Sequence, residues 1–161
     1  MLSAEDGILD YCVPGVQTCA LPICPRIFEL AGVKHEDIDV TGCYDAFTYT
    51  VLLQLESYGW CKPGEGKDYV KSGVINLGGK VPNNTSGGHL CEAYTHGMNM
   101  VIENVRQMRG TIDDYCPNAA NGEHTYDYSG GGCRQIKDAE TSMNMGWGTP
   151  AVGSALIMRR G

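Results

Sequence analysis

The chain has 161 residues, of which 42% are apolar and 19% charged, enough for one globular domain with a buried core. A formal net charge of -7 without any basic stripe argues against a nucleic-acid partner bound through its phosphates. The apolar runs fall far short of the length that spans a bilayer, so we expect no membrane segment.

The eight cysteines form no C-x-x-C pair, and no basic segment followed by an apolar run indicates a secretory signal. We therefore expect a reduced, cytoplasmic protein. Cys116, His124 and Cys133 are irregularly spaced, whereas structural zinc sites use four ligands that are usually closely paired. We expect no metal.

The first 24 residues show no amphipathic period. The run from Gly15 to Ile23 resembles the translation of a sequencing-library adapter, so we expect residues 1–24 to be non-native. The alternative is a genuine small N-terminal element. Residues 25–161 then form one domain.

The first half of this domain reads as helix, strand, helix and loop. Apolar spacing predicts a short helix over 25–31, where a glycine ends it, and alternation predicts a strand over 38–43. A second apolar pattern at helical spacing predicts a helix over 46–58. Residues 61–79 are rich in glycine and predict a surface excursion that is mainly loop.

The second half begins with a polar segment. In the stretch 83–97, Asn84 and Ser86 precede the pair Gly87 and Gly88. Paired glycines let backbone amides approach a ligand, and a helix N-terminus carries positive potential, so this pattern indicates an anion or oxyanion site. The alternative is an ordinary loop that enters a helix.

A third amphipathic helix is predicted over 98–110, with Glu103 and Gln107 on its solvated face. Residues 111–133 are polar and rich in turn residues, which predicts a surface insertion.

Two strands are predicted over 135–145 and 151–158. The residues between them, 146–150, contain glycine and proline and predict a loop. Trp147 in this loop would need a pocket for its ring.

Three separated segments resemble, in the same order, the active-site segments of the C-terminal half of a thiolase. They are Tyr44-Asp45-Ala46-Phe47, the Gly87-Gly88 loop ending in Tyr94-Thr95-His96-Gly97, and Trp147 to Ile157. The resemblance covers residues 25–161 and is nearest to lipid-transfer or sterol-carrier-type thiolases, including steroid side-chain aldolases and benzoylsuccinyl-CoA thiolase subunits. It implies an α/β fold with a mixed sheet and flanking helices, truncated to one of two similar halves.

The chain departs from the thiolase pattern at three positions. Tyr44 stands where ordinary thiolases carry an asparagine, Tyr94 replaces their histidine, and Trp147 falls at their acid–base cysteine. Paired tyrosines resemble the steroid side-chain aldolase branch, which implies catalytic roles for Tyr44 and Tyr94 in one pocket. A phenol can donate to a developing oxyanion, or accept a proton if hydrogen bonds lower its pKa.

The resemblance also implies residues around the two tyrosines. Asp45, His89 and His96 are expected to support the phenols, although capping or surface roles are the alternatives for them. The expected substrate-binding residues are Asn84, Ser86, Gly87, Gly88, Gly97 and Trp147.

We therefore expect a C-terminal fragment of a thiolase-like acyltransferase or retro-aldolase, which breaks or forms a carbon–carbon bond beside a CoA thioester. The resemblance implies acyl-CoA as substrate, no other cofactor, and no turnover alone, because the thiolase nucleophile lies in the N-terminal half. The alternative is a non-catalytic subunit that binds acyl-CoA or serves as a scaffold. Implied partners are a second copy in the full-length protein and a small subunit with an OB-fold and a zinc ribbon.

Overall fold

The structure is a computed structural model that describes residues 23–112, 134–149 and 152–161. Most of the segment predicted to be non-native, and the predicted insertion with Cys116, His124 and Cys133, lie outside these ranges. No helix within them is long and apolar enough to cross a bilayer. The elements are α1 (Ile23–Ala31), the 3-10 helix η2 (His35–Asp37), β1 (Val40–Cys43), α2 (Thr48–Ser57), α3 (Gly66–Lys71), α4 (Gly88–Cys91), α5 (Met98–Arg109), β2 (Thr141–Thr149) and β3 (Val152–Arg159).

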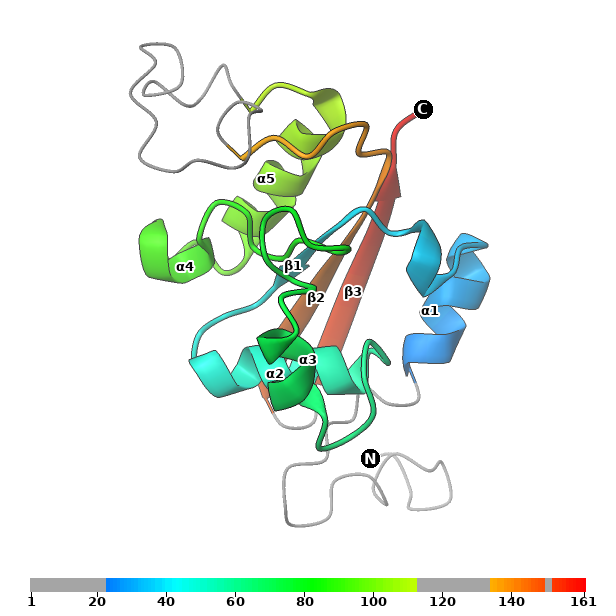
Figure 1. The fold of residues 1–161 in the computed structure, drawn as a ribbon, viewed down its shortest axis with the longest axis vertical. Helices are drawn as coiled ribbons and strands as arrows, with labels where there is room; N and C mark the ends of the chain where they lie inside the picture. The colour runs from blue at the N-terminus through cyan, green and yellow to red at the C-terminus, as the bar shows by residue number, and fades with distance from the viewer. Residues whose placement is uncertain (1–22, 113–133, 150–151) are drawn as a thin grey trace.

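The described strands form one mixed sheet in the order β1-β2-β3. β1 is parallel to β2, and β3 is antiparallel to β2. Helix α5 lies on one side of the strands and α1 on the other (Figure 1). The predicted α/β fold, a mixed sheet with flanking helices, is confirmed.

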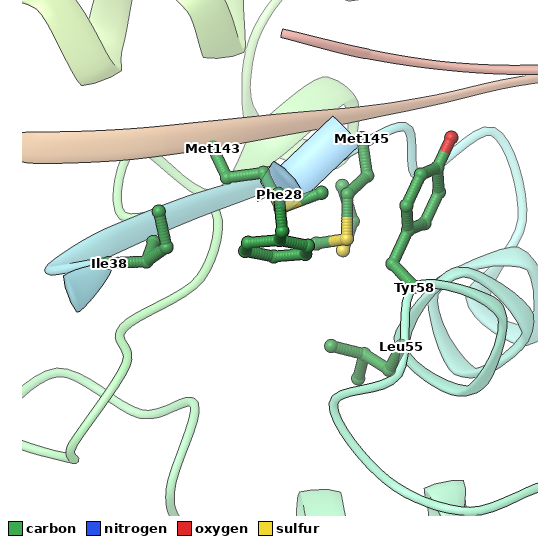
Figure 2. Close-up of a cluster of buried hydrophobic side chains, with 7 residues drawn as sticks. Phe28, Ile38, Leu55, Tyr58, Met143 and Met145 are labelled. Carbon is green, nitrogen blue, oxygen red and sulfur yellow. The ribbon is translucent and has the colours of Figure 1, made fainter. Parts of the chain in front are cut away.

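The alternation of side chains along β2 explains the two layers. Met143 and Met145 point to the face covered by α1 and α2, whereas Ser142 and Asn144 point to the opposite face, on which α5 packs. The buried apolar cluster on the first face consists of Phe28, Ile38, Cys43, Leu55, Tyr58, Met143 and Met145 (Figure 2). This cluster anchors the strands whose ends carry the site described below.

Two predicted loops contain regular structure. The excursion over 61–79 includes α3, and the predicted loop over 146–150 is wrong because β2 continues to Thr149. Its partner β3 supplies the antiparallel hydrogen bonds that hold Gly146 and Trp147 extended, with a register shift between Trp147 and Thr149. The strand predicted from residue 135 begins only at Thr141.

The face of α5 predicted to be solvated is buried at two positions. Glu103 is 2% exposed and Gln107 is 1% exposed. Arg134 covers them, since its Nε lies 2.7 Å from Glu103 Oε1 and its carbonyl oxygen accepts a hydrogen bond from Gln107. Burial of these polar groups is tolerated because each of them has a partner.

Candidate active site

The fold brings two tyrosines from distant loops together. Tyr44 directly follows β1, and Tyr94 lies in the loop between α4 and α5. Their phenol oxygens are 2.5 Å apart, and their rings meet edge to face with centroids 6.3 Å apart. Tyr94 is 59% exposed, so the pair lies at the surface.

The backbone of Tyr44 is held by a side chain from α2. Gln54, which is 1% exposed, accepts a hydrogen bond from the Tyr44 N–H at 2.9 Å. Its Nε2 donates to the Tyr44 carbonyl oxygen at 2.6 Å. Sequence reasoning missed Gln54, although a polar residue next to the apolar positions of a predicted helix is a signal that could have found it.

His89 connects the loops that carry the tyrosines. The N–H of Gly97 donates to His89 Nε2 at 3.0 Å, which leaves the proton of the neutral ring on Nδ1. The ring centroid lies 4.8 Å from that of Tyr44 and 5.1 Å from that of Tyr94. His96 also contacts Tyr94, with ring centroids 4.7 Å apart. Both predicted supporting histidines therefore pack against the pair.

Asp45 occupies the position that the sequence predicted for an anionic ligand. Its Oδ1 accepts a hydrogen bond from the backbone N–H of His89 at 3.0 Å, so it caps α4. His89 Nδ1 lies 3.0 Å from the same oxygen, but without the alignment of a hydrogen bond, so this contact is electrostatic. Asp45 thus caps α4 and not the helix that follows it in the chain, since α2 has Phe47 at its N-cap and no side-chain cap hydrogen bond. Its support of a phenol stays a prediction.

Two of the predicted glycines are required by close approaches. Gly88 has φ +62°, and a Cβ there would collide with the Asp45 carboxylate. Gly97 has φ +88°, and a Cβ there would lie 3.2 Å from Tyr44 Cδ2. Because these two residues have no side chain, the Asp45 carboxylate and the Tyr44 ring can lie close to the backbone at these positions.

The other residues of the polar loop make contacts with the protein itself. Asn84 pairs with the backbone of Cys43, accepting from its N–H at 2.8 Å and donating to its carbonyl oxygen at 3.0 Å. Ser86 donates to Glu92 at 3.1 Å, and Gly87 adopts φ +93° before α4. These contacts fix the loop, and the substrate-binding roles of the three residues remain predictions.

An open cavity of about 260 Å³ lies between the start of α5 and the sheet, beside Tyr44. It is lined by Gly42, Tyr44, His96, Gly97, Met98, Met100, Val101, Asn144, Met145, Gly146, Ser154, Ala155 and Leu156. Trp147 does not line it. The indole contacts Tyr49 of α2, with ring centroids 6.4 Å apart, on the other face of the sheet. The extended strand turns alternate residues to opposite faces, so Trp147 lies away from this cavity, and its predicted substrate-binding role stays a prediction.

The pair has a defined electrostatic character. The hydrogen bond with Tyr94 is the main cause that raises the pKa of Tyr44 from 10.0 to about 12, and burial and the nearby Asp45 carboxylate add to it. Tyr44 is thus protonated at neutral pH and suited to donate a hydrogen bond. Burial also raises the pKa of the Cys43 thiol, which makes that residue a poor nucleophile.

This geometry allows a directed chain of donors. If Tyr44 donates to the Tyr94 oxygen, the hydrogen of the Tyr94 phenol is left to point away from the pair. An exposed donor of this kind can stabilise negative charge that develops on a substrate oxygen, or exchange a proton with it.

Comparisons with known proteins identify a family and several relatives. The family described as thiolase C-terminal domain-like matches residues 17–133. A 17-hydroxy-3-oxo-4-pregnene-20-carboxyl-CoA lyase of Mycobacterium tuberculosis is 46% identical over 86 residues, 53% of this chain and 22% of the lyase. Benzoylsuccinyl-CoA thiolase subunit BbsB of Thauera aromatica is 32% identical over 114 residues, 68% of this chain and 29% of that subunit.

A solved structure also matches. The Ltp2-ChsH2(DUF35) aldolase aligns with a TM-score of 0.71 and 32% identity, covering 91% of this chain and 33% of that chain. The sequence is also 35% identical over 72 residues to sterol carrier protein 2 of Bos taurus, which is 45% of this chain and 13% of that protein. This chain therefore spans a third or less of the length of each of these proteins.

Proposed function

This chain belongs to the family of thiolase C-terminal domains, and from that premise we propose that it is part of an enzyme acting on a carbon–carbon bond beside a CoA thioester. The names of its relatives support this reaction class, since they include a carboxyl-CoA lyase, a benzoylsuccinyl-CoA thiolase subunit and a steroid side-chain-cleaving aldolase. The resemblance to the lipid-transfer and aldolase branch is confirmed by these relatives.

The hydrogen-bonded pair of Tyr44 and Tyr94 carries the proposal. The two phenols stand at the positions of the thiolase asparagine and histidine, and they favour retro-aldol cleavage over thiolysis. In that reaction the β-hydroxyl of an acyl thioester loses its proton as the bond between the α and β carbons breaks. A carbonyl product leaves, and the resulting thioester enolate takes up a proton at its α carbon.

The two tyrosines have different roles in this proposal. Tyr44, whose pKa is raised to about 12, remains protonated and donates to the Tyr94 oxygen. Tyr94, the exposed partner, acts as its phenolate: it accepts the proton of the β-hydroxyl and then donates that proton to the α carbon of the enolate, which restores the phenolate. A hydrogen bond from Tyr44 stabilises this phenolate.

The substrate in this proposal is an acyl-CoA, and no other cofactor takes part. The name of the structural neighbour joins two components, Ltp2 and ChsH2(DUF35), and both the aldolase and the lyase are much longer than this chain. We accordingly propose that the full-length protein forms a homodimer and binds a second, different subunit. The isolated chain is proposed to lack turnover.

The test compares the 161-residue chain with the full-length protein that contains it. Both are assayed for cleavage of a β-hydroxyacyl-CoA and a β-ketoacyl-CoA. The proposal expects the full-length protein to cleave the β-hydroxyacyl-CoA and the isolated chain to cleave neither. Binding of acyl-CoA without cleavage by the full-length protein and its partner subunit would instead support a non-catalytic binding or scaffold subunit.

A further inference from the structure

Asn144 has a buried amide that the fold leaves unpartnered. The residue is 8% exposed, and neither Oδ1 nor Nδ2 has a hydrogen-bond partner among the described residues. A buried amide without partners is unfavourable, and an apolar side chain of similar size would avoid that penalty. The packing of the described residues therefore does not explain an asparagine at this position.

The position of Asn144 links its amide to the cavity beside Tyr44. Residues Gly42 and Asn144 are paired in the register of β1 and β2, and both line this cavity. Oδ1 of Asn144 lies over Gly42, where a Cβ would be only 2.5 Å from it. Because Gly42 has no side chain, the Asn144 amide can occupy the space above it on the face of the sheet toward α5.

The rest of the cavity wall is mainly apolar and adaptable. Met98, Met100 and Val101 line it from α5, and Leu156 lines it from β3. Methionine side chains are unbranched and flexible, so they can move aside and open a path to the covered amide. An apolar wall of this kind can pack against a hydrocarbon chain, and the single amide within it can form a hydrogen bond with one polar atom on that chain.

We propose that this cavity binds the acyl group of the thioester and that the Asn144 amide recognises a hydroxyl or carbonyl oxygen carried by that group. The inference rests on the proposed function and deepens it, because it makes Asn144 a specificity-determining residue for oxygenated acyl chains. An amide can donate to either kind of oxygen and can accept from a hydroxyl. A substrate without the oxygen leaves the amide unpaired, which is the basis of discrimination.

The experiment measures binding of two pantetheine thioesters to the 161-residue chain by calorimetry. The 6-hydroxyhexanoyl thioester carries a hydroxyl other than the β-hydroxyl assigned to Tyr94, and the hexanoyl thioester lacks it. We expect the chain to bind the hydroxylated thioester about tenfold more tightly, as one hydrogen bond to a buried amide allows. In Asn144→Leu this preference falls to about onefold, while the melting temperature stays the same or rises because an unpaired amide is removed.

Ser142 provides a matched control. It lies two residues before Asn144 on the same strand face, is fully buried, and its hydroxyl also has no partner among the described residues, yet it does not line the cavity. Ser142→Ala is expected to keep the tenfold preference.

Three results would overturn the inference. They are an unchanged preference in Asn144→Leu, an equal loss in Ser142→Ala, and equal or undetectable binding of both thioesters by the unsubstituted chain. The proposed function is tested by a different measurement, since it fails if the full-length protein does not cleave the β-hydroxyacyl-CoA.

Discussion

The phenol oxygens of Tyr44 and Tyr94 lie 2.5 Å apart although 50 positions separate the two residues in the chain. Tyr44 is placed by the end of β1 and by Gln54, and Tyr94 is placed by the loop that His89 ties to Gly97. The pair is therefore a property of the folded domain, and it can be tested by changing each of these supports.

The titration of Tyr44 should depend on Tyr94. The raised pKa of about 12 means that Tyr44 stays neutral where an ordinary phenol, with a pKa near 10.0, is largely ionised. At about pH 10.5, which lies between these two pKa values, Tyr44 is mostly neutral and adds little phenolate absorbance. We therefore expect Tyr44→Phe to absorb only slightly less than the unsubstituted chain at this pH. In a Tyr94→Phe background the same substitution should remove a much larger absorbance, because the main cause of the shift is gone.

The shift also predicts how stability changes with pH. A phenol whose pKa is higher in the folded state contributes stability below pH 10, and this contribution is lost as pH rises through about 12. The unfolding midpoint in urea should therefore fall less steeply with pH above 10 in Tyr44→Phe than in the unsubstituted chain. Equal slopes for the two proteins would contradict the assigned shift.

Gly88 should be intolerant of a side chain because of Asp45. Its φ of +62° and the position of the Asp45 carboxylate lead us to expect that Gly88→Ala lowers the free energy of unfolding by about 2–4 kcal/mol. Part of this loss should disappear when Asp45→Ala is also present, since the collision is then removed. A double-mutant cycle in urea measures this coupling, and strictly additive effects would show that the two residues do not meet.

Gln54 should act on Tyr44 through the backbone. Gln54→Met keeps the length of the side chain but removes both hydrogen bonds to Tyr44, so we expect a loss of about 1–3 kcal/mol in unfolding free energy. The pKa of Tyr44 should also move toward 10.0, because the phenol is no longer held against Tyr94. In Tyr94→Phe the same change should lower stability without a further shift of the titration.

The buried ion pair on α5 should be a structural support. Glu103→Gln removes the charge that faces Arg134 at 2.7 Å, and we expect a loss of about 2–3 kcal/mol, since Arg134 keeps partial contact with water. Glu29→Gln, on an exposed residue of α1, serves as the control and should change stability by less than about 0.5 kcal/mol. Similar losses in both variants would contradict the buried role of Glu103.

Local patterns in the sequence were sufficient to predict the elements that present the tyrosines. Apolar spacing predicts the helices that became α2 and α5, and the strand-to-helix junction places Tyr44 at the end of β1. These features depend on residues close together in the chain. The approach of Tyr94 to Tyr44 was inferred from the family resemblance, because a contact over such a distance leaves no periodic signal.

The errors at Glu103 and in the predicted loop 146–150 have a different cause. Glu103 is buried by Arg134, which lies 31 positions away in the chain. Helical spacing alone carries no information about this distant residue and therefore predicts that Glu103 is exposed to solvent. The side of the sheet on which a residue lies depends on the register of β2, where a change of one position reverses the face. That register turns Trp147 toward α2 and places Asn144 at the cavity.

The most direct test of the tyrosine pair is the steady-state cleavage of a β-hydroxyacyl-CoA by the proposed full-length protein, its Tyr44→Phe and Tyr94→Phe variants, and a Tyr49→Phe control. Tyr49 is an exposed tyrosine that contacts Trp147 away from the pair. We predict that kcat falls by about 100-fold or more in Tyr94→Phe and by roughly tenfold or more in Tyr44→Phe, with KM little changed and the control unaffected. Full activity in both variants of the pair would contradict the account.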